Sequence, residues 1–334
     1  MSKKGVLLIN VGTPESTSLF SVQKYLSQFL GDKRVINLPF VARKILVNGL
    51  IVPFRGPKSR KQYKKLWTNN GSPLLHYSIE LKKKLQKQLG NNFHVYFGMR
   101  YGNPSLKLAV DNMGKDNLSE IIVLPLFPQY SSATTGTAID YSLKLIRKWN
   151  VIPKITIANQ FYDNQAFISA FTENIKTHLK NNYDHILFSY HGLPLKQVFN
   201  SHDNSDCEEF NCTTEVNDQN QYCYHATCYQ TTKLFVERLG LSEDQYTVCF
   251  QSRFTKNWLS PFTDEIIIQK AKVGVKKLLV VSPSFVTDCL ETIVEISVDY
   301  KQLFEAHGGV HLQLVESLND NDDWIKALQS IILR

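Results

Sequence analysis

The stretch Ile186-Leu187-Phe188-Ser189-Tyr190-His191-Gly192-Leu193-Pro194 indicates the fold class of this chain. It begins with a short apolar run, which is typical of a buried strand, and the glycine and proline that follow end the strand. The pattern recurs at Leu278-Leu279-Val280-Val281, which is followed by Asp288 and Glu291. Polar groups thus follow the carboxyl ends of two buried strands, where open α/β sheets build their sites.

Apolar runs alternate with amphipathic segments along the whole chain. We expect strands at Val6–Val11, His94–Met99, Ile121–Leu126, His185–Tyr190, Thr247–Gln251 and Leu278–Val281. Helical patterns separate these runs, and strands that alternate with helices indicate βαβ units and a parallel sheet. The series begins again after Pro153, so we predict an α/β fold of two doubly wound parallel-sheet (Rossmann-like) domains with an interdomain cleft.

The length of the chain also favours two domains, because 334 residues exceed the size at which one hydrophobic core usually divides. The predicted first domain covers residues 1–158 and is completed by a C-terminal helix over 312–334. The predicted second domain covers residues 159–311 and carries a polar, cysteine-rich insertion over 200–228.

The composition restricts the class of function. Apolar residues make up 43% and charged residues 20%, which is typical of a soluble globular enzyme. No run approaches the ~18–20 apolar residues of a membrane span, and Val6–Ile9 is too short for the core of a signal peptide. We therefore expect a cytoplasmic protein without disulfides. The chain has no glycine-rich dinucleotide or phosphate loop and no recognised nucleic-acid motif, so we expect no nucleic-acid partner.

Charge is distributed unevenly along the sequence. The stretch from Lys33 to Ile79 contains ten Lys and Arg residues and no Asp or Glu, and apolar residues lie between the basic ones. Such interleaving suits an anionic amphiphile or an anionic membrane surface. We predict peripheral contact with anionic membrane here, and a merely solvated basic face is the alternative.

The acidic residues after the last predicted strand have a regular spacing. Asp288, Glu291, Glu295 and Asp299 are separated by three, four and four positions, which places all four on one face of a helix. Like charges at this spacing repel each other. A solvated acidic face is one interpretation. The other is a ladder of oxygen ligands that passes a divalent cation toward His191.

Several short motifs make the chain recognisable. They are Leu8-Ile9-Asn10-Val11-Gly12-Thr13-Pro14, Gly98-Met99-Arg100-Tyr101, Pro125-Leu126-Phe127-Pro128-Gln129-Tyr130-Ser131, Ser189-Tyr190-His191-Gly192-Leu193-Pro194, Gln251-Ser252-Arg253, Trp258-Leu259-Ser260-Pro261 and Asp288-Cys289-Leu290-Glu291-Thr292. In this order they resemble ferrochelatase, the lyase that inserts ferrous iron into protoporphyrin IX to give protohaem in the last step of haem biosynthesis. A related chelatase acting on coproporphyrin III or sirohydrochlorin, or a non-catalytic metal- or haem-binding protein, is the alternative.

The resemblance implies the roles of particular residues. His191 and Glu291 would be catalytic and would face each other across the porphyrin cleft. The porphyrin would contact the side chains of Asn10, Arg100, Tyr130 and Trp258. Iron, the metal substrate, would be bound by His191, Glu291, Asp288 and Glu295. Some family members carry a second histidine where this chain has Cys289.

The proposed residues suit the chemistry that the resemblance implies. Metal insertion removes two protons from the inner N–H groups of the porphyrin. A neutral His191 can accept one proton, and Glu291 can accept the other or hold the iron first. Ferrous iron binds both carboxylate and imidazole. The sequence leaves open whether the protein is a monomer or a homodimer.

Four of the six cysteines are clustered. Cys207, Cys212, Cys223 and Cys228 are separated by four, ten and four residues, and in a cytoplasmic chain this indicates a metal site rather than disulfides. Four thiolates suit either a [2Fe–2S] cluster or structural zinc. Because some ferrochelatases carry a [2Fe–2S] cluster, we predict that cluster, with zinc or free thiols as alternatives. His202 and His225 are possible stand-in ligands.

Overall fold

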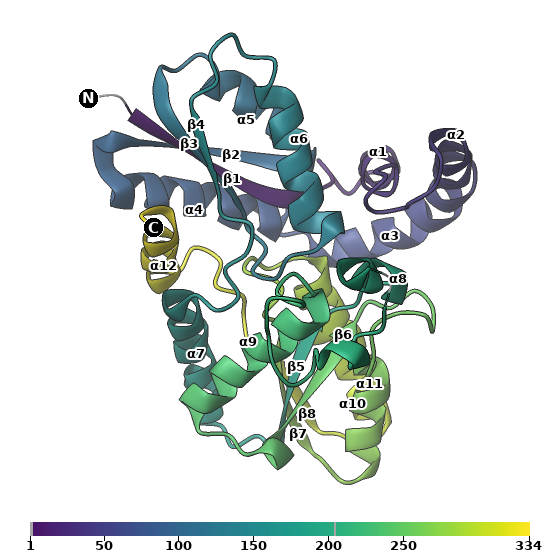
Figure 1. The fold of residues 1–334 in the computed structure, drawn as a ribbon. Coiled ribbons are helices and arrows are strands. Elements are labelled where there is room, and N and C mark those ends of the chain that lie inside the picture. Colours follow the sequence, from purple (N-terminus) through teal and green to yellow (C-terminus); the bar gives the residue numbers. More distant parts are fainter. Residues whose placement is uncertain (1–2, 204) are drawn as a thin grey trace. The chain divides into compact units, whose positions relative to one another are not determined.

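The computed structural model describes residues 3–203 and 205–334. The chain forms two compact units, each of which has its own parallel sheet (Figure 1). Unit 1 comprises Met1–Phe127, Ser132–Gln160 and Asp320–Arg334, and unit 2 comprises Pro128–Ser131 and Phe161–Asn319.

Unit 1 is built on a four-stranded parallel sheet in the order β2-β1-β3-β4. Its strands are β1 (Lys3–Thr13), β2 (Phe93–Gly102), β3 (Leu118–Pro125) and β4 (Lys154–Ile157). The helices of this unit are α1 (Leu19–Leu30), α2 (Phe40–Lys44), η1 (Ile45–Ile51), α3 (Val52–Leu66), α4 (Pro73–Leu89), η2 (Gly90–Asn92), α5 (Leu106–Met113), η3 (Ser132–Gly136), α6 (Thr137–Ile146) and α12 (Asp322–Ile332). Val6, Leu7, Leu8 and Ile9 of β1 are all fully buried, as expected when helices cover both faces of a sheet.

Unit 2 repeats the same strand order as β6-β5-β7-β8, again all parallel. Its strands are β5 (His185–His191), β6 (Tyr246–Gln251), β7 (Lys277–Val281) and β8 (His311–Leu314). Its helices are α7 (Gln165–Leu179), α8 (Leu195–Phe199), η4 (Asn200–His202), η5 (Glu208–Phe210), α9 (Tyr224–Leu239), η6 (Glu243–Gln245), α10 (Thr263–Lys272), η7 (Leu290–Tyr300) and α11 (Lys301–Ala306).

The strand order determines where a site can form in each unit. In a doubly wound sheet of this order, the strands that come first and third in the sequence lie side by side. The connections that follow these two strands run in opposite directions, and ligands bind at the carboxyl ends of the two strands. In unit 2 these strands are β5 and β7, which lead to His191 and to the segment that begins η7. In unit 1 they are β1 and β3, which lead to Asn10 and toward Tyr130.

The predicted α/β fold class with two parallel sheets is confirmed, but several predicted elements differ from the structure. The predicted C-terminal helix over 312–334 is wrong at its start. His311–Leu314 form β8, whose alternating burial is that of a strand, and α12 begins only at Asp322. The short strand β4 was not predicted. Residues 224–228 belong to α9 rather than to the cysteine-rich loop.

The basic segment also has more regular structure than its sequence pattern suggested. Residues 40–66 form a continuous helical run in which the π-helix η1 lies between α2 and α3. Figure 1 shows α1, α2 and α3 grouped at one side of unit 1. In the part of the chain that the structure describes, no helix combines the length and the apolar content that crossing a membrane requires.

We predict that Gly12→Ala lowers the free energy of unfolding by about 3 kcal/mol or more, because strained and overlapping substitutions give the largest losses. Gly12 has φ +123°, and a Cβ there would lie 1.8 Å from the backbone oxygen of Tyr101. Urea unfolding followed by circular dichroism measures the change. Gly49→Ala is the control, because no atom would lie within 4 Å of its Cβ. We expect its stability to be unchanged or raised by up to about 1 kcal/mol, and equal losses in both variants would contradict the argument.

Candidate functional site

His191 is the last residue of β5, and its imidazole lies beside an aromatic ring with one ring nitrogen unpaired among the described residues. The ring lies edge-on to Phe285 at a centroid distance of 5.9 Å. Its Nδ1 is buried and has no hydrogen-bond partner among the described residues. Burial lowers the pKa of His191 below its ordinary value of 6.5, although the charge of Glu291 opposes this effect. The imidazole is therefore neutral near pH 7 and can accept a proton.

The buried side chain of Gln251, at the end of β6, connects the strand ends of unit 2. Its Oε1 accepts hydrogen bonds from Ser189 Oγ at 2.9 Å and from Ser282 Oγ at 3.0 Å. Its Nε2 donates to the backbone oxygen of Glu291 at 2.9 Å. One amide thus joins β5, the residue after β7 and the first turn of η7, so the strand end that carries His191 and the helix that carries Glu291 share one anchor.

Glu295, one of the predicted metal ligands, is held by several hydrogen-bond donors of unit 2. Its carboxylate accepts hydrogen bonds from the backbone N–H of Ser252 at 2.8 Å, from the Ser252 hydroxyl, and from the Tyr300 hydroxyl at 2.9 Å. Ser252 adopts φ +61°, a conformation that non-glycine residues rarely take. Burial raises the pKa of Glu295, and these hydrogen bonds act in the opposite direction.

The predicted place of Asp288 on the face of an acidic helix is wrong. The π-helix η7 begins at Leu290, so Asp288 precedes it. Its carboxylate is buried and accepts hydrogen bonds from Thr292 Oγ1 at 3.0 Å, Ser317 N at 3.2 Å and Asn319 Nδ2 at 2.7 Å. The structure therefore uses Asp288 to join the start of η7 to the segment that follows β8.

Glu291 is the acidic residue whose carboxylate interacts with His191. It is half-buried, and its charge acts on the imidazole. The neighbouring Cys289 thiol is buried, which raises its pKa, and the Glu291 carboxylate with which it hydrogen-bonds raises that pKa further. Cys289 is thus a neutral thiol at pH 7.

Trp258 and Tyr130 are the two predicted aromatic contacts in unit 2. Trp258 forms an isolated bridge with Pro194 and lines an open groove of about 520 Å³ together with Leu195, Phe199 and Asn257. The backbone approaches closely here, because a Cβ on Gly192 would lie 2.7 Å from the Gln251 backbone oxygen. Tyr130 packs edge-on against Tyr222 at a centroid distance of 5.8 Å.

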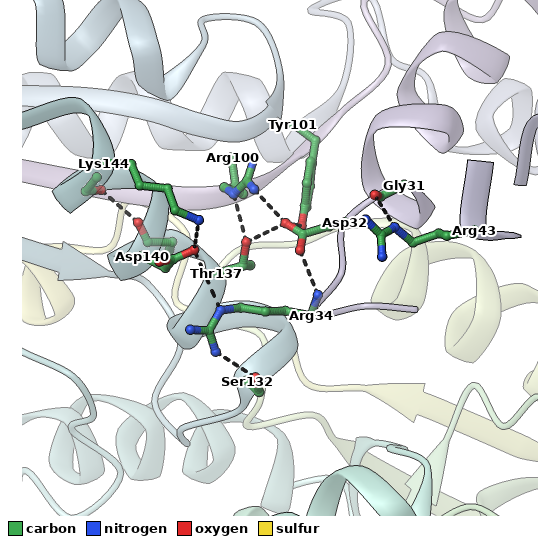
Figure 2. A network of polar contacts seen from close by, with 12 residues as sticks. Gly31, Asp32, Arg34, Arg43, Arg100, Tyr101, Ser132, Thr137, Asp140 and Lys144 are labelled. Atoms are coloured by element: carbon green, nitrogen blue, oxygen red, sulfur yellow. Dashed lines mark hydrogen bonds and ion pairs between the residues drawn. The ribbon is translucent and has the colours of Figure 1, made fainter. Parts of the chain in front are cut away.

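In unit 1, Asn10 is buried near the carboxyl end of β1 and donates from Nδ2 to Ser78 Oγ at 3.4 Å. Arg100, near the end of β2, is held in the polar network that Figure 2 shows. Its guanidinium pairs with Asp32, donates to Thr137 Oγ1 at 2.9 Å, and lies over the ring of Tyr141 at 4.3 Å. Arg100 is therefore fixed by its own unit.

Asp32 is the centre of this network, and it was not among the functional residues expected from the sequence. It accepts hydrogen bonds from Thr137 Oγ1 at 2.6 Å, Tyr101 OH at 2.9 Å and Arg34 N at 2.8 Å. Burial alone would raise its pKa, but these hydrogen bonds and the Arg100 charge lower it. A signal was present in the sequence, because Asp32 is the only acidic residue between Glu15 and Glu80.

The cysteine-rich segment brings a set of four buried ligand atoms together. Nitrogen from His202 and sulfur from Cys207, Cys212 and Cys223 all lie within 4.8 Å of one another. Three of the predicted cysteine ligands therefore meet, and His202 occupies the fourth position. Cys228 lies outside this group, as does His225. Cys228 is fully buried on α9, and burial raises the pKa of its thiol well above the ordinary value.

Comparisons with known proteins agree over the whole chain. A sequence model of the ferrochelatase family matches residues 3–334. The ferrochelatase of Legionella pneumophila (strain Lens) is 45% identical over 331 residues, which cover 99% of this chain and 98% of the relative. That of Coxiella burnetii (strain RSA 493 / Nine Mile phase I) is 40% identical over 330 residues, with coverage of 98% and 92%. The solved structure of SirB from Bacillus subtilis with Fe3+ has a similar fold, with a TM-score of 0.55, 11% identity, and coverage of 99% of this chain and 94% of that one.

We predict that His191 titrates below 6.5 and that Glu291→Gln moves its pKa further down. The Glu291 charge stabilises the protonated imidazole, so removing that charge favours the neutral form. An NMR titration of ring-labelled histidine measures both values. His307→Gln identifies an unrelated histidine signal and leaves the His191 pKa unchanged. An upward shift in Glu291→Gln would contradict the electrostatic argument.

Proposed function

Because the chain belongs to the ferrochelatase family, we propose that it inserts ferrous iron into protoporphyrin IX to give protohaem, with the release of two protons. The observation that carries this proposal is the neutral, half-buried imidazole of His191, whose Nδ1 is buried and has no hydrogen-bond partner among the described residues, at the end of β5 beside the carboxylate of Glu291. A base and an acidic metal ligand at one strand end are what the reaction requires.

We assign the two catalytic roles to these two residues. A porphyrin loses two inner protons when iron enters, and neutral His191 accepts the first. Glu291 supplies a carboxylate oxygen that holds the incoming iron or accepts the second proton. Since the Glu291 charge opposes the fall in the His191 pKa, the carboxylate also stabilises the imidazolium formed by the first transfer.

The other two predicted metal ligands act differently in our proposal. All the hydrogen bonds of Asp288 and Glu295 described above come from groups of unit 2 itself. Removing a carboxylate from such donors costs about 1–3 kcal/mol for each buried group left unsatisfied. We therefore propose that both residues position η7, and that Glu291 and His191 alone contact iron.

We propose that the porphyrin contacts come from the predicted set Asn10, Arg100, Tyr130 and Trp258, which differ in the support that the structure gives them. Trp258 has the clearest support, because it lines an open groove near the end of β5 and offers an aromatic face to a flat macrocycle. Arg100 has weaker support as a direct contact, because Asp32 and Thr137 already hold its guanidinium. We assign to Arg100 a positioning role at the end of β2.

We also propose that the segment over residues 38–54 contacts an anionic membrane surface, from which an apolar porphyrin can be supplied. Exposed apolar side chains gather there, namely Leu38, Phe40, Val41, Ile45, Leu50 and Phe54. Phe40 is 67% exposed and Phe54 is 77% exposed, and Lys44 and Arg55 are exposed beside them. Arg43 is not part of this surface, because it is buried and donates to Gly31 O at 2.9 Å. The protein would thus be cytoplasmic and peripherally bound.

We predict that His191→Ala lowers the rate of iron insertion by at least about 10²-fold, the typical contribution of a positioned general base. Anaerobic assays with ferrous iron and protoporphyrin IX measure the rate. His185→Asn, at the opposite end of β5, is the matched control and retains most activity. Near wild-type turnover by His191→Ala would contradict the proposed role of His191 as the base.

The same assay tests the proposed substrate. Faster turnover of coproporphyrin III or sirohydrochlorin than of protoporphyrin IX by the unmodified protein would change the proposed substrate.

We predict that the double variant Phe40→Asp/Phe54→Asp loses binding to vesicles that contain anionic lipid, because it places charge where apolar side chains enter the interface. Co-sedimentation with vesicles measures binding, which should weaken as salt is added. Val151→Asp is the control, because Val151 is 80% exposed but lies outside this segment. Equal binding by the double variant and the unmodified protein would exclude this surface.

A further inference from the structure

The four ligand atoms of His202, Cys207, Cys212 and Cys223 form a buried site that the iron-insertion chemistry does not use. All four residues are 6% exposed or less. Cys207 Sγ lies 3.8 Å from Cys223 Sγ, and Cys212 Sγ lies 3.3 Å from His202 Nε2. Buried polar groups converging in this way are costly unless they share a ligand or hydrogen bonds.

These positions do not fit the [2Fe–2S] cluster that the family resemblance implied. In such a cluster each iron binds two protein ligands, and the two irons with their bridging sulfides lie between the pairs. Ligands on different irons are therefore more than about 5 Å apart. Here all four ligand atoms lie within 4.8 Å of one another. They therefore cannot be divided into two pairs that are far enough apart to bind two different irons of one cluster. The predicted all-cysteine cluster would also require Cys228, which lies outside the group.

The same distances fit a single tetrahedral metal ion. With a zinc–sulfur bond of about 2.3 Å, the edge of a tetrahedron is about 3.8 Å, and a sulfur–nitrogen edge is about 3.6 Å. Two of the six ligand–ligand distances compare directly with these edges: Cys207 Sγ–Cys223 Sγ is 3.8 Å and Cys212 Sγ–His202 Nε2 is 3.3 Å. Three thiolates and one imidazole are also a recognised ligand set of structural zinc sites.

We propose that His202, Cys207, Cys212 and Cys223 form a mononuclear Cys₃His zinc site. Three contacts near these residues support the proposal. The imidazole of His202 is fixed by stacking on Phe210 at 4.4 Å. Cys223 is the N-cap of α9, where the helix dipole favours a thiolate. Asn220 is buried and donates to the backbone oxygens of Phe210 and Glu215, each at 3.0 Å.

The site supplies stability that the segment otherwise lacks. Between η4 and α9 the described residues form only the single 3-10 turn η5, and most of their side chains are polar. A zinc ion joins η4, the start of η5 and the N-terminus of α9 through four bonds. Metal binding to such a segment contributes directly to its folding. Cys228 is a small apolar residue of α9 in this arrangement.

The test measures metal content in the full-length protein, so it does not depend on activity. The protein is purified anaerobically, without chelators, from cells supplied with both zinc and iron. Zinc, iron and acid-labile sulfide are then quantified. We expect about one zinc and no sulfide per chain, as a mononuclear site requires. After exchange, cobalt(II) should give the intense visible bands of tetrahedral thiolate coordination.

Two variants separate the mononuclear site from the four-cysteine cluster. His202→Ala should lose most of the zinc, and His202→Cys should retain it because a thiolate can replace the imidazole. Cys228→Ala is the matched control and should keep its full zinc content. Circular dichroism verifies that each variant is folded. The proposal would be overturned if the protein contained two irons and two sulfides per chain, lost them in Cys228→Ala and kept them in His202→Ala. A folded, metal-free protein with reactive thiols would also overturn it.

Discussion

The buried amide of Gln251 is the interaction on which the arrangement of unit 2 depends. It accepts from Ser189 and Ser282 and donates to the backbone of Glu291. A primary amide can do both at once without carrying charge, whereas a carboxylate only accepts and an ammonium only donates. In a buried position a charged residue would also incur a large desolvation cost. An uncharged connector therefore holds three elements together and leaves the electrostatics of the site to His191 and Glu291.

The acidic residues around this amide show how the fold restricts metal binding. Asp288 and Glu295 have their oxygens occupied by donors from unit 2, which is why we assign both a positioning role rather than a place in a ladder of metal ligands. An enzyme that transfers iron must bind the ion weakly enough to release it to the porphyrin. A site with one carboxylate and one imidazole satisfies that condition, whereas a cage of four carboxylates would retain the ion.

The sequence predicted features that depend on local pattern and missed those that depend on tertiary contacts. His191 at a strand end and the parallel α/β class follow from periodicity and from the residues that end each run. The hydrogen bonds of Asp288 come from Ser317 and Asn319, and residues so distant in the chain leave no spacing signal. Nor does spacing reveal that Asp32 pairs with Arg100. β8 was missed because four residues are too few to separate alternation from a helical pattern.

The ligand types of the two proposed metal sites would let one chain hold two metals without exchanging them. The site at the end of β5 offers oxygen and nitrogen, which suit ferrous iron in transit. The proposed site beside α9 offers three sulfur atoms, which favour zinc and hold it tightly. Burial of its four ligand residues limits access by incoming iron. In our two proposals, the softer sulfur ligands and the deeper burial of the cysteine-rich site therefore separate the metals, with ferrous iron at Glu291 and His191 and zinc at the cysteine-rich segment.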